Sequence, residues 1–277
     1  MSSRVILGDN LKFLQTLADA SVPLIYIDPP FNTGRRQQRR TIKATRDATG
    51  KTGFNGASYR RVETGKQAYA DAFEDYLGFL RPRMEQAYRV LAADGALYFH
   101  IDYREAHYAR VQLLDPMFGR DALINEIIWA YDYGGRPKDR WPSKHETIFF
   151  YAKDPARFLF NAAEITREPY MAPGLVGPEK AARGKLPTDV WWHTIVGTAS
   201  REKTGYPSQK PLGIMRRIIQ ASSLPGDTVL DFFAGSGSTG AACLELGRKF
   251  MLVDENPQAI KVMKQRFKGQ AVRFERG

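Results

Sequence analysis

Short apolar runs alternate with longer segments in which apolar residues recur at helical spacing along most of the chain. This pattern predicts strands at 5–7, 24–27, 96–101, 126–131, 147–151, 228–231 and 250–253, with a further short strand at 271–274. It predicts helices at 10–17, 71–91, 105–117, 211–222, 238–246 and 257–267. Strands that alternate with helices indicate an α/β fold with a doubly wound, mostly parallel sheet. Ligands of such a sheet bind beyond the carboxyl ends of its strands.

Two regions interrupt this pattern. Between 154 and 206, Pro and Gly recur, and Phe158, Phe160, Tyr170, Trp191 and Trp192 are scattered among charged residues. The segment 34–67 is poor in aliphatic residues and rich in Gly, Thr and Gln. It therefore has no core of its own, and we expect it to be a long, mobile, basic loop.

The charge of the chain is concentrated in that segment. The whole chain has a formal net charge of +11 and a pI near 9.7. Segment 34–67 has ten basic residues against two acids, a net charge of +8, so the rest is close to neutral. The basic residues are Arg35, Arg36, Arg39, Arg40, Lys43, Arg46, Lys51, Arg60, Arg61 and Lys66. Such a loop is suited to neutralising nucleic-acid phosphates, and the alternative is an inert, solvated insertion.

The remaining composition excludes several classes of protein. The single cysteine, Cys243, forms neither an internal disulfide nor a cysteine-based zinc site. No apolar run is long enough for a membrane span, and the first residues, MSSRVILGDN, contain no apolar signal segment. We therefore expect a cytoplasmic protein. The four histidines have no metal-like spacing, so core or surface roles are expected for them.

A glycine-rich turn follows the strand expected at 228–231. Gly235 and Gly237 allow a tight bend and a close approach of the backbone to a ligand. Asp254 ends the next strand, where a carboxylate is able to accept both hydroxyls of a ribose. The turn also matches GxGxxG, so a nicotinamide-dependent dehydrogenase is an alternative. Two observations argue against a dehydrogenase. Asp231 beside the turn disfavours a pyrophosphate and favours a cationic ligand. Only forty residues follow Gly237, so the turn does not open a long nucleotide-binding half.

A second motif follows the strand expected at 24–27. Asp28 is followed by Pro29, Pro30 and Phe31. The prolines fix φ and remove two backbone donors, so nearby carbonyls lack competing amides. Asp28 and a carbonyl near Pro29 are then able to hold the two hydrogens of an aromatic amino group, on which Phe31 is able to stack. The alternative is an ordinary Asp-Pro turn.

Together these motifs resemble the amino-methyltransferases of DNA. The order, with Asp28-Pro-Pro-Phe31 before Asp231-Phe-Phe-Ala-Gly-Ser-Gly237, is similar to the permuted β class, which contains many adenine-N6 enzymes. Asp9 and Lys210 lie in segments that also resemble this class. The chain departs from the family pattern at Phe232, where proline is frequent, and at Ser238, where threonine is frequent.

The resemblance implies a seven-stranded sheet of the S-adenosylmethionine-dependent methyltransferase type with one antiparallel strand. It implies a catalytic half at 1–154, a target-recognition insertion at 155–205 and a cofactor half at 206–277. Asp28, Pro29, Pro30 and Phe31 are the implied catalytic residues, and Lys210 is expected near the methionine carboxylate. The implied cofactor-binding residues are Asp9, Ser208, Lys210, Asp231, Phe233, Ala234, Gly235, Ser236, Gly237 and Asp254. The residues expected to contact DNA are Arg35, Arg36, Arg39, Arg40, Lys43, Arg46, Arg60 and Arg61.

The implied function is transfer of a methyl group from S-adenosylmethionine to adenine N6 in double-stranded DNA, with the base flipped out of the helix. Cytosine N4 is the alternative target, and its enzymes more often have Ser in place of Asp28. A catalytically silent nucleic-acid-binding protein of the same fold is a further alternative. A homodimer and a cognate restriction endonuclease are the expected partners. The sequence leaves the roles of Asp102, Trp191 and Trp192 open.

Overall fold

A computed structural model describes residues 2–32, 37–52, 58–69, 73–197 and 199–277, and of 37–52 and 59–69 it describes the backbone. The chain divides into two compact units, one formed by residues 1–29 and 75–277 and the other by 30–74. Within its described residues, the structure has no helix that is both long and apolar enough to cross a membrane.

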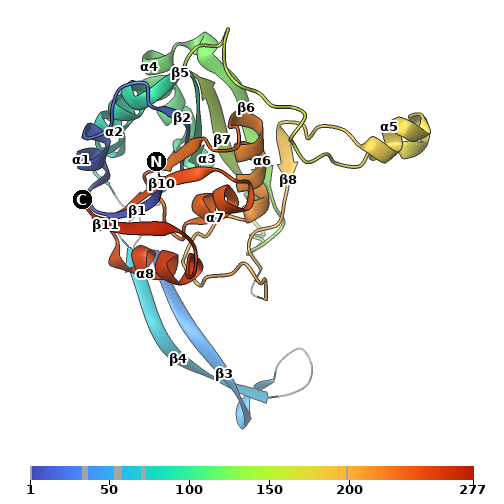
Figure 1. Cartoon of the computed structure of the whole chain (residues 1–277). Coiled ribbons are helices and arrows are strands. Elements are labelled where there is room, and N and C mark those ends of the chain that lie inside the picture. Colours follow the sequence, from blue (N-terminus) through green and yellow to red (C-terminus); the bar gives the residue numbers. More distant parts are fainter. Residues whose placement is uncertain (1, 33–36, 53–57, 70–72, 198) are drawn as a thin grey trace. The chain divides into compact units, whose positions relative to one another are not determined.

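The first unit is built on one sheet (Figure 1). Its strands are β1 (Ser3–Leu7), β2 (Val22–Ile27), β5 (Leu91–Ile101), β6 (Leu123–Ala130), β7 (His145–Ala152), β8 (Val190–Trp192), β9 (Thr228–Asp231), β10 (Lys249–Asp254) and β11 (Val272–Arg276). The central strands are almost wholly apolar, as strands buried on both faces require.

The strand order among the described residues is β11-β1-β10-β9-β2-β5-β7-β6-β8. All neighbours run parallel except β7, which is antiparallel to β5 and to β6. The expected mostly parallel sheet with a single antiparallel strand is therefore confirmed. The expected number of seven strands is too low, because the short strands β11 and β8 extend the two edges of the sheet.

Helices cover both faces of this sheet (Figure 1). One face packs against α6 (Leu212–Ser222), α7 (Ser238–Glu245) and α8 (Pro257–Arg266), whose apolar residues join those of the strands in one core cluster. The other face carries α1 (Asn10–Gln15) and α2 (Tyr76–Val90). Asp75 caps α2 by accepting a hydrogen bond of 2.8 Å from the Gly78 amide, so this helix begins later than the predicted residue 71.

The helix predicted at 105–117 is present in a modified form. It consists of α3 (Tyr103–Ala109), a π-helical segment Arg110–Leu114 and α4 (Asp115–Phe118). Each other predicted helix and strand has a counterpart shifted by a few residues at most.

The irregular region after residue 154 contains a 3₁₀ turn at Pro173–Leu175 and α5 (Pro178–Arg183). It also contributes β8 to the sheet, which the sequence pattern did not predict. A backbone bridge pairs Glu168 with Lys185, and α5 lies away from the sheet beyond this bridge (Figure 1).

The second unit contains an antiparallel hairpin of β3 (Gln37–Thr52) and β4 (Ser58–Tyr69). The register pairs Arg40 with Lys66 and Ala44 with Arg61. The prediction of a mobile loop over 34–67 is wrong for these residues. Backbone hydrogen bonds between two strands need no apolar core, so a scarcity of aliphatic residues did not exclude a hairpin.

Candidate active site

Four loops that carry predicted site residues follow neighbouring parallel strands. Asp28 follows β2, Asp231 ends β9, Asp254 ends β10, and Gly8 and Asp9 follow β1. β2 pairs directly with β9, with Leu24 opposite Val229, and β9 pairs with β10. The structure therefore brings the Asp28 motif and the glycine turn to the same edge of the sheet, although about two hundred residues separate them along the chain.

The glycine turn has a backbone conformation that requires glycine. Gly235 and Gly237 have φ angles of 51° and 72°, in the left-handed region. A Cβ atom on Gly237 would lie 2.8 Å from the Cγ atom of Met263. The amide of Gly235 donates a hydrogen bond of 2.8 Å to Oδ2 of Asp254, which joins the turn to the end of β10.

Asp231 is buried behind this turn. Its Oδ1 accepts a hydrogen bond from the Phe233 amide (3.0 Å), and its Oδ2 accepts one from the Thr239 hydroxyl (2.6 Å). Burial raises the pKa of Asp231 to about 7. These contacts show that Asp231 ties the strand end to α7, and its contact with a cationic ligand remains a prediction.

Asp254 and Asp9 lie beside each other at the ends of β10 and β1. The amide of Gly8 donates to the carbonyl of Asp254 (3.2 Å). Asp254 Oδ1 accepts from the Asn256 amide (2.8 Å), and burial raises the pKa of Asp254 to about 6. Asp9 caps α1 through the Lys12 amide, and 39% of its side chain is exposed. Two carboxylates, the turn amides and two left-handed glycines form a donor and acceptor set that fits a nucleoside with ribose hydroxyls.

Asp28 holds one carboxylate oxygen toward Lys210 and leaves the other without a partner. Lys210 Nζ lies 2.8 Å from Oδ2 of Asp28. Oδ1 is buried and has no hydrogen-bond partner among the described residues. A buried carboxylate oxygen without a donor is costly, so it marks where an amino group of a ligand would bind.

Lys210 also approaches a second carboxylate that the sequence interpretation missed. Its Nζ lies 3.3 Å from Oε2 of Glu146, which in turn lies 2.8 Å from Nε2 of His100. The Tyr26 hydroxyl and His100 Nδ1 are 2.8 Å apart. We call Asp28, Lys210, Glu146, His100 and Tyr26 the Asp28 network.

The location of Glu146 follows from the direction of β7. Because β7 is antiparallel, its first residues lie where the parallel strands end, and Glu146 is the second residue of β7. A charged residue at the start of the one antiparallel strand is the signal that could have identified it. The expected position of Lys210 near a methionine carboxylate is untested, but its ammonium group lies between Asp28 and Glu146.

Burial and charge act in opposite directions in this network. Burial raises the pKa of Asp28, and Lys210 partly offsets that effect. Burial alone would raise the pKa of Glu146, but Lys210 and His100 outweigh it and lower the pKa to about 2. Burial disfavours the ammonium of Lys210, yet the two carboxylates raise its pKa. Lys210 therefore stays charged.

The backbone of Lys210 links this network to the glycine turn. The hydroxyl of Ser238, the first residue of α7, donates a hydrogen bond of 2.8 Å to the carbonyl of Lys210. Ser236 is buried and accepts from the Arg266 guanidinium, whereas Ser208 is exposed and has a φ of 55°. Phe233 packs against Phe79 with ring centres 6.2 Å apart. The Ala234 amide bonds to β10, through the Val253 carbonyl at 3.1 Å.

Some predicted residues belong to the second unit or lie outside the described residues. Pro30 and Phe31 begin the second unit, so their catalytic roles stay predictions. Arg35 and Arg36 are not among the described residues. The other six predicted DNA-contact residues lie on the hairpin, and they are Arg39, Arg40, Lys43 and Arg46 on β3 and Arg60 and Arg61 on β4.

The structure shows the contacts of three residues whose roles the sequence left open. Asp102 caps α3 and forms an ion pair with Arg104 (2.7 Å). Trp191 is buried, and its indole donates to the Thr188 carbonyl (2.8 Å), whereas 71% of Trp192 is exposed. Cys243 is buried, as expected.

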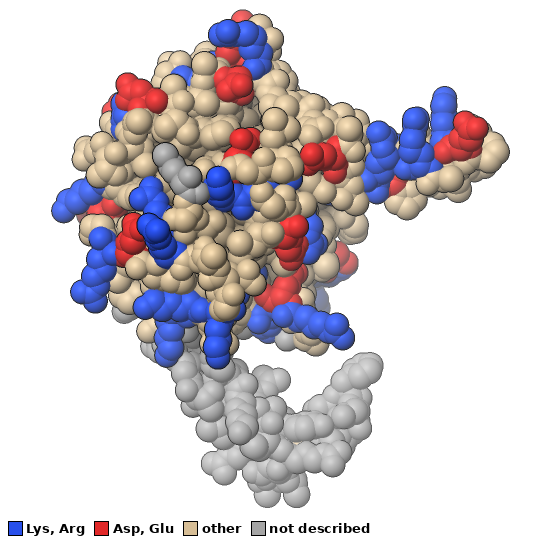
Figure 2. Space-filling model, viewed as in Figure 1, with Lys and Arg blue, Asp and Glu red and all other residues tan. Residues whose placement is uncertain are grey.

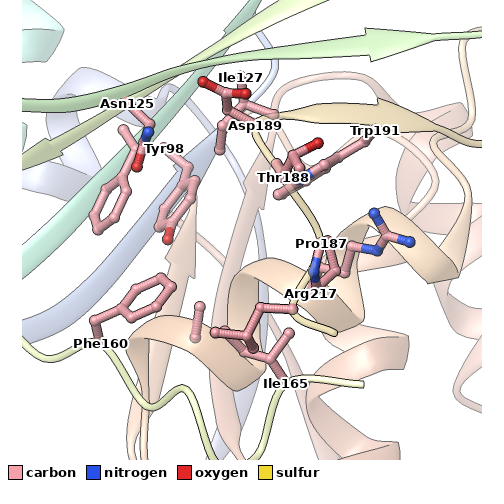
Figure 3. A pocket seen from close by; sticks show the side chains of 13 residues that line it. Tyr98, Asn125, Ile127, Phe160, Ile165, Pro187, Thr188, Asp189, Trp191 and Arg217 are labelled. Atoms are coloured by element: carbon pink, nitrogen blue, oxygen red, sulfur yellow. Dashed lines mark hydrogen bonds between the residues drawn. The ribbon is translucent and has the colours of Figure 1, made fainter. Parts of the chain in front are cut away.

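A cavity of about 320 Å³ lies between the sheet, α6 and the segment that precedes β8 (Figure 3). Tyr98 and Phe150 form its inner wall, and Trp191, Asp189 and Arg217 border it. Tyr98 lies three residues before the end of β5, so the cavity is set back from the carboxyl ends of the strands. We therefore do not place the reaction in it.

Comparison with known proteins supports the methyltransferase fold that the sequence motifs implied. Among solved structures, the fold is similar to the PvuII DNA methyltransferase, described as cytosine-N4-specific (TM-score 0.68, 15% identity, 96% of this chain and 87% of that chain). It is also similar to the M1.HpyAVI–SAM complex (TM-score 0.60, 19% identity, 96% of this chain and 98% of that chain). At these identities the likeness shows the fold, which is that of the methyltransferases.

The sequence comparisons identify the family. Residues 22–265 match the family described as DNA methylase. The chain is 31% identical over 266 residues to the DNA adenine methyltransferase YhdJ of Escherichia coli K12, covering 93% of this chain and 80% of the relative. It is 28% identical to the type II methyltransferase M.HpaI of Haemophilus parainfluenzae, covering 99% and 77%. The chain belongs to the DNA methylase family.

Proposed function

We propose that this protein is an S-adenosylmethionine-dependent DNA methyltransferase that acts on adenine N6 at a specific site in double-stranded DNA. The observation that carries this proposal is the buried Oδ1 of Asp28, which no described residue donates to, beside a turn that fits a nucleoside cofactor. Relatives named as an adenine methyltransferase and a type II methyltransferase support the target base and the site specificity.

Asp28 and its neighbours would orient the adenine amino group. Its nitrogen lone pair is delocalised into the ring, so N6 is a poor nucleophile. Oδ1 of Asp28 accepts one N6 hydrogen and the carbonyl of Pro29 accepts the other, which favours a tetrahedral nitrogen whose lone pair points at the methyl group. A bound S-adenosylmethionine supplies that methyl group as an electrophile. Positioning and electrostatics supply most of the rate, since no covalent intermediate is required.

The glycine turn and its neighbours would hold the cofactor. Asp254 accepts the ribose hydroxyls, Asp9 contacts the adenine ring, and the amides around Gly235 and Gly237 lie against the ligand. Ser208, Phe233, Ala234 and Ser236 line the same turn. Residues 206–277 form the cofactor half in this assignment, and 1–154 form the catalytic half.

The hairpin and the insertion at 155–205 would bind DNA. The hairpin carries most of the net charge of the chain, which suits it to phosphate contacts. In the insertion, Met171 and Leu175 are 96% and 88% exposed near α5, which contains Lys180 and Arg183. Figure 2 shows further Lys and Arg side chains on the part of the first unit that carries α8 and β11. A homodimer and a cognate endonuclease are proposals supported by the type II relative alone.

The identity of the methylated base decides between the two targets. After incubation of duplex DNA with the protein and S-adenosylmethionine labelled in its methyl group, mass spectrometry of the nucleosides should find the label in N6-methyl-2′-deoxyadenosine. Label in N4-methyl-2′-deoxycytidine would transfer the assignment to the cytosine enzymes, and no label in any nucleoside would favour the catalytically silent alternative.

The hairpin assignment predicts a change in the salt dependence of DNA binding. Replacing Arg60 and Arg61 together with Gln should lower the slope of log K against log salt by about 1.8, because each lost phosphate contact contributes about 0.9. The measurement is fluorescence anisotropy of labelled duplex at several salt concentrations. Replacing the exposed Arg136 and Arg140, each of which pairs with an aspartate in the first unit, is the matched control. An equal loss of slope in the control would remove the hairpin from the phosphate interface.

A further inference from the structure

The Asp28 network contains more charged groups than holding an adenine amino group requires. One carboxylate, Asp28, faces the site, yet an ammonium and a second carboxylate are buried behind it. Exposed fractions of the side chains are 15% for Asp28, 8% for Lys210 and 15% for Glu146. Burying three charged groups is costly, and breaking such a set is more costly, so their arrangement calls for a physical explanation.

We propose that Lys210 and Glu146 are positioning residues that set the charge and the orientation of Asp28, with Lys210 keeping it ionised and Glu146 limiting how strongly Lys210 binds it. This inference rests on the proposed function of Asp28. It gives both residues roles in the methyl transfer that act through Asp28, with no contact to the base.

Lys210 acts on orientation as well as on charge. Its Nζ lies 2.8 Å from Oδ2 of Asp28, and no described donor reaches Oδ1. A single point of attachment on one oxygen turns the other toward the site. The Ser238 hydroxyl, bonded to the Lys210 carbonyl at 2.8 Å, connects this attachment to the cofactor turn. The geometry therefore links the proposed amino-group acceptor to the turn that would hold the methyl donor.

Glu146 divides the attraction of Lys210 between two carboxylates. The distance from Lys210 Nζ to Glu146 Oε2 is 3.3 Å, only 0.5 Å longer than its distance to Asp28. A carboxylate that is fully neutralised by one ammonium is a weaker acceptor for an amino hydrogen. By sharing the ammonium, Glu146 leaves part of the negative charge of Asp28 for N6.

The rest of the network holds Glu146 in place. Nε2 of His100 lies 2.8 Å from Oε2 of Glu146, and Nδ1 of the same ring lies 2.8 Å from the Tyr26 hydroxyl. The Tyr131 hydroxyl donates to Oε1 of Glu146 (3.3 Å). Both Glu146 oxygens are thus directed by neighbours, His100 on β5 and Tyr131 directly after β6.

The proposal predicts opposite pH shifts for two variants. The charged groups that act on Asp28 are Lys210, His100 and Glu146, and Asp231 lies on the adjacent strand. Loss of the ammonium in Lys210→Met raises the pKa of Asp28, so the acidic limb of the plot of kcat/KM against pH should move to higher pH by about 1–3 units. Loss of the second carboxylate in Glu146→Gln lowers the pKa of Asp28, so the acidic limb should move to lower pH.

The rate at the plateau of the profile should also fall. In Lys210→Met, with the orientation of Oδ1 lost, we expect a reduction of about 10²-fold in single-turnover methyl transfer. Lys210→Arg keeps the charge and should leave the limb at the wild-type pH, which keeps the test valid if Lys210→Met folds poorly. The dissociation constant for S-adenosylmethionine, measured by calorimetry, should change little in all three variants.

A buried cation remote from the site provides the control. Arg248 is 5% exposed and pairs at 2.7 Å with Glu164, whose side chain is 37% exposed. Arg248→Met removes a buried charge and its ion pair and should leave the acidic limb unmoved. If the limb shifts in the same direction in both network variants, or in neither, the positioning roles are wrong.

Two further results separate this inference from the proposed function. A large loss of cofactor affinity in Lys210→Met would assign Lys210 to the methionine carboxylate and overturn the positioning role while leaving the methyltransferase function intact. Full activity of Asp28→Asn would instead overturn the proposed role of Asp28 itself.

Discussion

Asp28→Asn is expected to lower the rate of methyl transfer by about 10³-fold, with little change in cofactor affinity. The amide keeps the size of the carboxylate but places a carbonyl oxygen or a hydrogen-bond donor where N6 needs an anionic acceptor. It also removes one of the carboxylates that pair with the Lys210 ammonium, which lies 2.8 Å from Oδ2. The rate is measured by single-turnover transfer of a labelled methyl group to duplex DNA.

Because the acceptor acts mainly as the new bond forms, kcat and kcat/KM should fall together. Asp102→Asn is the matched control, since Asp102 also follows a strand at this edge but caps α3 and pairs with Arg104. A rise in KM for DNA with unchanged kcat would mean that Asp28 only binds the substrate, and the assigned role would then be wrong.

The sequence predicted the parts of the fold that depend on local pattern. The near-continuous apolar runs of β2, β9 and β10 are typical of strands buried on both faces, and their neighbours in the chain had helical spacing. Since all of these strands run parallel, the loops after them meet at one edge. Strand direction therefore predicted that Asp28 and the glycine turn share an edge of the sheet, and the pairing of β2 with β9 makes them neighbours there.

The parts that the sequence did not reveal depend on pairings between distant segments. Strand β8 has three residues, of which only Trp191 is buried, so it has no pattern that separates it from a loop. The hairpin of β3 and β4 has the composition of a solvated segment, and its strands are defined by their mutual backbone bonds. Neither kind of pairing leaves a local signal.

Glu146 and Lys210 show the same limit within the site. Glu146 lies just before the strand predicted at 147–151, and its contact with Lys210 depends on β7 being antiparallel. Lys210 was placed beside the cofactor because its segment precedes the cofactor strand. Its predicted contact with the methionine carboxylate stays a prediction. The Lys210 carbonyl accepts a hydrogen bond from Ser238, and the side chain extends to Asp28.

Asp254→Ala is expected to weaken binding of the cofactor. Asp28→Asn, by contrast, is expected to slow the methyl transfer itself. Two hydrogen bonds from ribose hydroxyls to a carboxylate would be lost, and each such bond to a charged group contributes about 1.5–3 kcal/mol. The dissociation constant for S-adenosylmethionine should therefore rise by roughly 10²- to 10⁴-fold. Calorimetry of the protein without DNA measures it directly.

Asp254 also receives the Gly235 and Asn256 amides, so its removal could act through the turn alone. Asn256→Ala separates the two effects, because it removes the cap of α8, bonded to the Gln258 amide, and leaves the carboxylate in place. If that variant loses as much affinity as Asp254→Ala, the effect comes from the stability of the turn and the ribose contact is refuted. If Asp254→Ala alone loses affinity, and reaches a near-normal rate at saturating cofactor, then binding by Asp254 and catalysis by Asp28 are separate functions of two strand ends, those of β10 and β2, which flank β9 in the sheet.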